Sequence, residues 1–257
     1  MLRLPDRRSI RRVVIALGAG GLCHSLFALG GGSMVWSMYF GLSESFGTVP
    51  WPWALLSNAA LVLQFPLAHS LLLTPAGQRL LAAVVPSPFG KPLATTTYAT
   101  IAAIQLALLF LLWTPSGIVW WRAEGAALLF MTGLYASTWL LLSIAVINSG
   151  WQLQSGALGW LALVRDRAPR FPDLPQTGLY RLVRHPIYLA FALTLWTVPT
   201  WTPDQFALAI AFTAYCVLAP MHKESRLLKI HGDRFAAYRR RVPYWLPFRL
   251  KDRNNVC

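Results

Sequence analysis

Acidic residues and cysteines are scarce in this sequence. Its 257 residues include nine Asp and Glu and three cysteines. Two of the cysteines, Cys23 and Cys216, fall inside apolar runs and the third is Cys257, so no disulfide framework is expected. The sequence shows neither His-x-x-x-His spacing nor a cysteine pair, and no zinc or haem site is expected.

Charged residues of either sign are also few. Only 12% of the residues are charged, whereas 56% are hydrophobic and the mean hydropathy is +0.48. An average soluble domain is about one quarter charged. The composition therefore indicates a polytopic membrane protein. There is no internal repeat, which disfavours a channel or transporter built from inverted halves.

Six apolar runs approach the length of about 20 residues that a helix needs to cross the hydrocarbon. The sequence therefore predicts an all-α, polytopic helical bundle forming a single integral-membrane domain over residues 1–257. The expected spans are 13–36, 51–73, 96–113, 125–147, 186–201 and 203–221. The last two are joined by Thr202-Pro203-Asp204, which predicts a tight helical hairpin. The run Gly18-Ala19-Gly20-Gly21 predicts close helix packing rather than a nucleotide loop, because no strand precedes it.

Basic residues are distributed unevenly across this arrangement. Of the 23 Lys and Arg residues, 22 fall on one side and only Arg122 on the other. The positive-inside rule places both termini in the cytoplasm, at the inner membrane if the cell is bacterial. The net charge of +14 then reflects topology and attraction to membrane lipids, and nucleic acid is not an expected partner. The opposite side should carry a belt of aromatic anchors: Trp51, Trp53, Trp113, Trp120, Trp121 and Trp201.

Two polar segments, 150–185 and 222–257, lie on the basic side and are expected to form a cofactor site. The first should contain a short interfacial helix over 157–163. The second mixes apolar and charged residues and predicts one or two amphipathic helices against the bilayer, broken at Gly232. A hairpin of the last two spans would bring these side chains together: Tyr180, Arg184, His185, Tyr188 and Glu224.

The order of residues in the C-terminal third resembles a known superfamily. The pattern Gly-x-Tyr-x-x-x-Arg-His-Pro-x-Tyr at 178–188 is followed by Glu224, by Gly232 and Tyr238, and by Val242-Pro243. It resembles the isoprenylcysteine carboxyl methyltransferase superfamily of integral-membrane, S-adenosylmethionine-dependent enzymes. Upstream, Leu67-Ala68-His69-Ser70 and the stretch 96–120 are similar to its NnrU and methanethiol S-methyltransferase branch. The resemblance implies that these residues line the cofactor: Tyr180, His185, Pro186, Ile187, Tyr188 and Glu224.

The chemistry of these side chains suits S-adenosylmethionine. Arg184 and His185 can donate to a carboxylate, aided by the N–H groups of a helix beginning at Pro186. Glu224 can accept from an ammonium group or from ribose hydroxyls, and the tyrosines offer aromatic surface to adenine or a sulfonium. The alternatives are that Arg184 only snorkels and that Glu224 pairs at the surface with one of three cations: Arg181, Lys223 or Arg226.

Methyl transfer depends on alignment more than on acid–base groups, and the candidate catalytic residues are His69 and Arg184. His69 lies in an apolar run, where an ionisable group is a functional candidate, although a neutral histidine bonded to a hydroxyl is equally expected. In prenylcysteine enzymes an arginine is expected four residues before the glutamate. Here that residue is Pro220, which fits an uncharged acceptor.

The resemblance implies an S-adenosylmethionine-dependent membrane methyltransferase. The expected acceptor is a small hydrophobic thiol, with methanethiol converted to dimethyl sulfide, or a lipid-borne group entering from the bilayer. Alternatives are methylation of a phospholipid amine or of an isoprenylcysteine carboxyl group, and a non-catalytic NnrU-like accessory protein. The sequence does not predict an oligomeric state.

Overall fold

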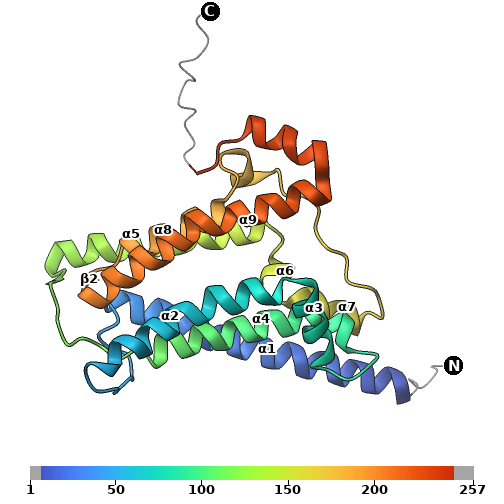
Figure 1. Cartoon of the computed structure of the whole chain (residues 1–257), viewed down its shortest axis with the longest axis horizontal. Coiled ribbons are helices and arrows are strands. Elements are labelled where there is room, and N and C mark those ends of the chain that lie inside the picture. Colours follow the sequence, from blue (N-terminus) through green and yellow to red (C-terminus); the bar gives the residue numbers. More distant parts are fainter. Residues whose placement is uncertain (1–6, 246–257) are drawn as a thin grey trace, which may run out of the picture. The chain divides into compact units, whose positions relative to one another are not determined.

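The computed structural model describes residues 7–245 and is helical apart from two short strands (Figure 1). By contacts the chain divides into two compact units. The first takes in the described residues of Met1–Arg122, Trp151–Phe171 and Thr200–Phe206. The second takes in those of Ala123–Gly150, Pro172–Pro199 and Ala207–Cys257. Cys257 and the end of the predicted cytoplasmic segment 222–257 lie outside the described residues.

Five of the described helices are long and apolar enough to cross a membrane. They are α1 (Arg7–Tyr39), α2 (Trp53–Leu72), α4 (Gly90–Leu111), α5 (Gly125–Asn148) and α9 (Pro203–Arg241). Large apolar side chains remain exposed on them; Leu129 of α5, for example, is 77% exposed. Since exposing such a side chain to water costs about 2 kcal/mol, lipid is its natural solvent. The chain is a multi-pass membrane protein.

The fifth predicted span, 186–201, is not a complete span in the structure. Its helix α8 (Pro186–Trp196) has 11 residues, which rise only about 16 Å and fall short of the ~30 Å hydrocarbon. Pro199 disfavours helix just beyond it, and Thr200–Trp201 instead form strand β2. Six spans are therefore not confirmed, and the all-α prediction misses a two-stranded sheet in which β1 (Trp121–Arg122) pairs antiparallel with β2.

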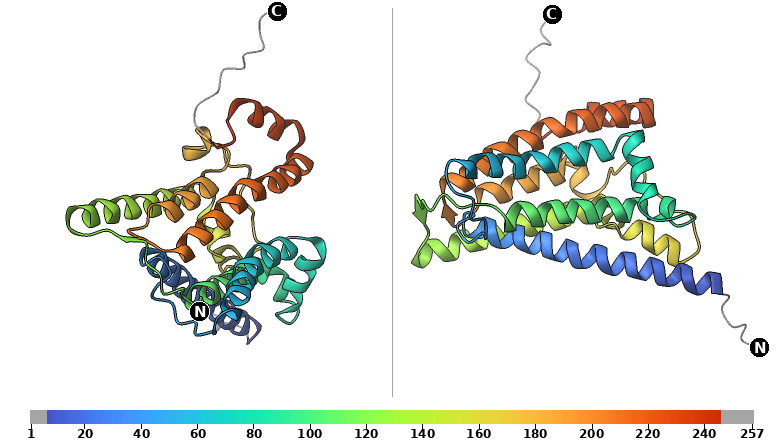
Figure 2. Two further views of the ribbon diagram at one scale, coloured as in Figure 1. Left: turned by 60° about the vertical axis from the view of Figure 1, so that its left-hand side comes forward. Right: turned by 60° about the horizontal axis from the view of Figure 1, so that its bottom comes forward.

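In the first unit, α4 packs against both α1 and α2, as Figures 1 and 2 show. Gly30 allows α4 to approach α1 closely. In the run Gly18-Ala19-Gly20-Gly21, for which close packing was predicted, Gly20 lies close to a neighbour, which belongs to α7 (Ala157–Val164). A Cβ added to Gly30 would meet the carbonyl oxygen of Ala103 at 2.4 Å, and one on Gly20 would meet the Trp160 ring at 2.7 Å. Gly18 and Gly21 have nothing within 4 Å of such a Cβ, so they do not serve this purpose.

Three short helices complete the first unit: α3 (Pro75–Ala83), α6 (Trp151–Gln154) and α7 (Ala157–Val164). The short helix predicted at 157–163 is thus confirmed. One hydroxyl of α4 fixes it, because Thr96 Oγ1 donates to the Gly156 carbonyl at 2.7 Å and accepts from the Trp160 N–H at 3.1 Å. The indole of Trp160 also donates to His24 Nε2 of α1 at 3.1 Å. Polar contacts therefore hold α7 against two membrane-crossing helices.

The beginning of α9 is fastened within the first unit. Thr202 caps the helix by accepting from the Gln205 N–H, and Asp204 accepts from Trp113 Nε1 at 3.1 Å and from the Ser116 N–H at 2.9 Å. Trp113 is consequently 4% exposed. The prediction that Trp113 anchors the protein at the lipid–water boundary is therefore wrong, because its indole satisfies a buried carboxylate instead.

In the second unit α5 packs against α8 and against the 3₁₀ helix η1 (Gly178–Arg181). The side chains of α8 and α9 also meet, since Trp196 Nε1 donates to the Thr213 hydroxyl at 2.9 Å. The predicted boundary at Met221 does not end the last helix, which continues to Arg241. Gly232 breaks it as expected, with φ 48° and ψ −128°, a conformation that only glycine adopts readily.

Candidate active site

The candidate site lies where the polar segment before α8 meets the second half of α9, within the second unit. His185 precedes α8 and Pro186 occupies its first turn, where a missing N–H costs nothing. Glu224 lies on α9, three turns past Thr213. The chain reversal at Gly232 then returns Val242 and Pro243 to the segment before α8, where the Arg184 N–H donates to the Pro243 carbonyl at 2.9 Å.

Glu224 is the centre of the polar contacts. Its Oε1 accepts from Arg184 Nε at 2.7 Å and lies 2.7 Å from His185 Nε2. The side chains of Glu224 and Arg184 are only 10% and 12% exposed. The sequence left open a surface pairing of Glu224 with Arg181, Lys223 or Arg226, and the structure instead pairs it with the two candidate site residues. Arg184 is therefore a buried partner in an ion pair and does not simply snorkel.

Arg184 also ties down the segment that follows α9. Its Nη1 donates to the carbonyl oxygens of Val242 at 2.7 Å and Arg239 at 3.1 Å. The Tyr244 ring covers the same cluster, with its centroid 5.3 Å from the guanidinium carbon and 4.8 Å from the His185 ring. A cation against an aromatic face adds about 0.5 to 2 kcal/mol.

Burial keeps His185 neutral near pH 7. The residue is 3% exposed, and loss of solvation lowers its pKa below the usual value, although the hydrogen bond to Glu224 opposes that shift. A neutral ring that donates from Nε2 to a carboxylate leaves Nδ1 as an acceptor. Across residues 7–245, that buried Nδ1 has no hydrogen-bond partner. An unsatisfied acceptor of this kind is unusual in a folded protein and fits a missing donor.

The remaining predicted residues surround this cluster at different depths. Tyr180 is buried beneath it, where the loss of solvation raises its pKa to about 12 and its carbonyl accepts from the Tyr238 hydroxyl at 2.8 Å. Pro186 is buried, and Ile187 and Tyr188 are half-buried in the first turn of α8. The Tyr188 ring lies 6.0 Å from the His185 ring. Tyr180 thus supports the segment, whereas the half-buried Tyr188 ring has the Lys223 ammonium 5.7 Å from its centroid.

His69 belongs to the first unit. It lies on α2, where its ring stacks on Phe65 at 5.2 Å and lies 4.8 Å from the Tyr98 ring of α4. The Tyr98 hydroxyl donates to the His69 backbone carbonyl at 3.4 Å. The catalytic role predicted for His69 stays a prediction.

Sequence reasoning missed Tyr244 and Asn148. Tyr244 directly follows the Val242-Pro243 pair of the motif, so its position in the sequence could have identified it as a candidate. Asn148 Oδ1 accepts from the Leu179 N–H at 2.9 Å and so positions the 3₁₀ helix below the site. Nothing in the local sequence marks that contact, because it joins residues 31 positions apart.

Comparison with known proteins gives a consistent picture. The chain is 28% identical to a methanethiol S-methyltransferase of Pseudomonas deceptionensis over 77% of its own length and 74% of that protein. It is 30% identical to methanethiol S-methyltransferase 2 of Bradyrhizobium diazoefficiens over 76% and 73% of the two chains. A nurim of Rattus norvegicus is 31% identical over 63% of each chain.

No protein-family profile and no solved structure matches the chain. The similarity to the methyltransferases nonetheless extends over most of both sequences, and the helical membrane architecture agrees with the superfamily that the motif at 178–188 resembles. An enzyme is therefore indicated, and the alternative of a non-catalytic accessory protein loses its support. The chain belongs to the methanethiol S-methyltransferase family of membrane methyltransferases.

Proposed function

We propose that this enzyme methylates methanethiol to dimethyl sulfide with S-adenosylmethionine as the donor. The observation that carries the proposal is the Arg184–His185–Glu224 cluster in a chain that is 30% identical to a methanethiol S-methyltransferase. Membership of the family implies a methyl donor. The choice of donor and of acceptor rests on the site's chemistry.

The residues of the cluster match the donor's functional groups. Arg184 offers a positive charge to a carboxylate, and Glu224 offers a negative charge to an ammonium group or acceptor oxygens to ribose hydroxyls. Among the residues that the structure describes, His185 Nδ1 is a buried acceptor without a partner, which suits one further hydroxyl or amine. When bound, S-adenosylmethionine supplies an electrophilic methyl group on a sulfonium. The half-buried Tyr188 can face that cation.

The chain's own contribution to the reaction is alignment. Arg184 and Glu224 hold each other, and the carbonyl oxygens of Arg239 and Val242 hold Arg184, so the charged groups are fixed before a ligand arrives. Preorganised groups of this kind lower the barrier of an in-line displacement by limiting the motion of the reacting atoms. The acceptor sulfur must also lose its proton to a base, and the sequence alone is the ground on which a catalytic role is proposed for His69.

The acceptor is proposed to be small and uncharged. Pro220, one turn before Glu224 on α9, is buried and has no group to hold a substrate carboxylate, as a prenylcysteine would require. Methanethiol is apolar enough to enter from the bilayer. A poorly solvated thiolate is also a stronger nucleophile.

The test combines calorimetry of S-adenosylmethionine binding with headspace detection of dimethyl sulfide, using the full chain in detergent. Glu224→Gln should weaken donor affinity at least about tenfold, since a bond to a charged group contributes about 1.5 to 3 kcal/mol. Asp233→Asn, an exposed carboxylate on the same helix, is the matched control. Equal affinity of the two variants would remove Glu224 from the site. Donor binding without dimethyl sulfide would reassign the acceptor to a lipid amine or prenylcysteine.

The orientation with both termini in the cytoplasm is part of the proposal. It is supported by the distribution of Lys and Arg, of which Arg122 alone lies on the opposite side of the predicted arrangement. Labelling of single cysteines placed at Arg122 and at Arg181 with a membrane-impermeant reagent tests it in intact cells. Only the cysteine at position 122 should react, and labelling at position 181 alone would reverse the topology.

A further inference from the structure

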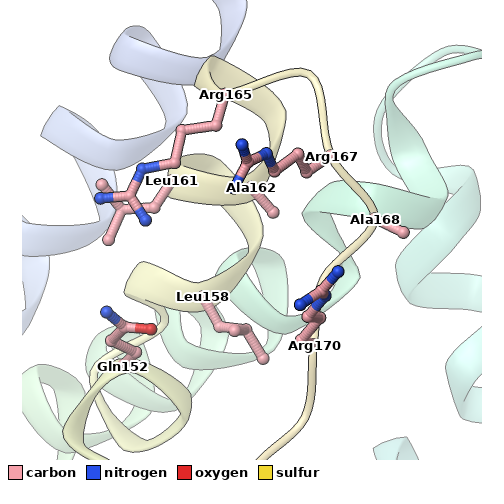
Figure 3. Close-up of a pocket in the computed structure, with 8 residues that line it drawn as sticks. All are labelled: Gln152, Leu158, Leu161, Ala162, Arg165, Arg167, Ala168 and Arg170. Carbon is pink, nitrogen blue, oxygen red and sulfur yellow. The ribbon is translucent and has the colours of Figure 1, made fainter.

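A second candidate site lies in the first unit, beside α7. There a half-open cavity of about 150 Å³ is lined by apolar and arginine side chains (Figure 3). Leu158 and Leu161 contribute to the floor. Arg165, Arg167 and Arg170 contribute the rim. None of these residues belongs to the cluster around Glu224.

The turn that ends α7 positions two of the arginines. Asp166 adopts the left-handed conformation, with φ 54°, and the N–H groups of Arg165 and Arg167 donate back to carbonyls of Leu161 and Ala162. The chain therefore folds back over its own helix and brings the basic side chains to the cavity, as the close-up shows. Because Thr96 fixes the start of the same helix, the floor is also held in place.

Within residues 7–245, the arginine side chains that line this cavity form no ion pair. Asp166 is the carboxylate nearest in sequence, and Arg12 of α1 already binds it in an ion pair. In the part of the chain that the structure describes, no carboxylate lies within 4.0 Å of the guanidinium nitrogens of Arg165, Arg167 or Arg170. Three like charges around one cavity repel one another, and a bound anion would relieve that repulsion.

The size and the floor of the cavity narrow the choice of anion. A cavity of about 150 Å³ holds a group about as large as benzene, and a phosphate has five heavy atoms. Arginine is well suited to phosphate because its planar fork donates two parallel hydrogen bonds. The leucine side chains of the floor, however, cannot form hydrogen bonds with a free, hydrated ion. They can pack against the carbon chain attached to a phosphodiester.

The cavity also lies beside ends of membrane-crossing helices. Leu163 of α7 packs with Ala16 of α1 and with Leu93, in the first turn of α4. Arg12, which binds Asp166, lies in the second turn of α1. The charge distribution predicts that these ends face the cytoplasm, where the leaflet is rich in anionic lipid.

We propose that this cavity binds the phosphate of an anionic membrane lipid, with Arg165, Arg167 and Arg170 holding the head group and Leu158 and Leu161 contacting the carbon atoms beside it. The bound lipid anchors α7 and the loop that follows it to the membrane surface. The proposal does not depend on which substrate the enzyme methylates.

Native mass spectrometry of the full chain in detergent tests this, with phosphatidylglycerol and phosphatidylcholine as competing probes. The wild type should retain phosphatidylglycerol preferentially. The triple variant R165Q/R167Q/R170Q should lose at least about tenfold in affinity for it. The triple variant R7Q/R8Q/R79Q removes the same charge from exposed positions of the same unit and should bind as the wild type does. Ala168→Glu, which places a carboxylate at the exposed edge of the cavity, should also abolish binding.

Three outcomes would overturn the proposal. If the two triple variants bound phosphatidylglycerol with equal affinity, lipid binding would reflect only the general attraction between a basic surface and anionic lipid. Retention of phosphatidylglycerol by R165Q/R167Q/R170Q at the wild-type level would remove the arginines from the site. Displacement of the lipid by an equal concentration of inorganic phosphate would make free phosphate the ligand. Unchanged thermal unfolding and unchanged S-adenosylmethionine affinity of the variants confirm that the fold is intact.

Discussion

The contact between Glu224 and Arg184 can be measured by a double-mutant cycle. Glu224→Ala leaves Arg184 without its carboxylate and His185 without its acceptor, in surroundings where the side chains are about nine-tenths buried. Breaking a buried ion pair costs about 3 to 5 kcal/mol. Because Arg184 keeps the carbonyl oxygens of Val242 and Arg239, we expect a loss near 3 kcal/mol.

The coupling between the two residues should be smaller than the cost of either replacement. A hydrogen bond to a charged group contributes about 1.5 to 3 kcal/mol, so the cycle of Glu224→Ala, Arg184→Ala and the double variant should give about 2 kcal/mol. That value corresponds to roughly a 30-fold change in the unfolding equilibrium constant at 25 °C. Reversible unfolding in mixed micelles, followed by tryptophan fluorescence, supplies the free energies.

The chain offers a matched control for this cycle. Asp173 and Arg234 also form an ion pair, at 2.6 Å, but their side chains are 60% and 56% exposed. Water and salt screen such a pair, and its replacements should add without measurable coupling. Additive effects of Glu224→Ala and Arg184→Ala, within about 0.5 kcal/mol, would refute the inference that burial makes their contact strong.

Three further predictions concern single residues. His69→Ala should lower kcat for dimethyl sulfide formation more than it lowers S-adenosylmethionine affinity, and full activity would leave His69 as a packing residue only. Burial lowers the pKa of His185 in the folded state, so as the pH falls the unfolded state takes up this proton first. The contribution of His185 to the free energy of unfolding should therefore be constant above about pH 6.5 and fall below it. Unfolding of His185→Gln between pH 5 and 8 should lack that fall, whereas the exposed control His222→Gln should keep it. Tyr244→Leu should weaken donor affinity about threefold, as expected for a lost cation–π contact of about 0.7 kcal/mol, and Tyr244→Phe should not.

Features with local causes could be predicted from the sequence. Pro186 begins α8, and Gly232 interrupts α9, because each residue restricts or frees its own backbone. Helix geometry could also have excluded two of the three surface partners considered for Glu224. Lys223 and Arg226 are one and two positions away on the same helix, where side chains do not face one another.

Features with distant causes could not be predicted in the same way. Trp113 is apolar and sits at the end of a span, so its pattern indicates a lipid anchor; its burial depends on Asp204, 91 residues later. Residues 197–201 continue an apolar run, and their departure from helix depends on Pro199 together with a strand partner at Trp121–Arg122. The Tyr244 contacts require the chain reversal at Gly232 and the return to Arg184. Composition carries no information on any of these pairings.

Gly232 has a consequence for how this chain tolerates change. In most proteins the positions that resist substitution are the crowded ones, yet Gly232 is exposed and has nothing within 4 Å of an added Cβ. Its backbone angles nevertheless exclude other residues. Substitution of every residue in turn should thus identify Gly232 as an exposed position that tolerates no other side chain. The defect should appear as lost donor binding, because the segment from Val242 to Tyr244 would no longer reach Arg184.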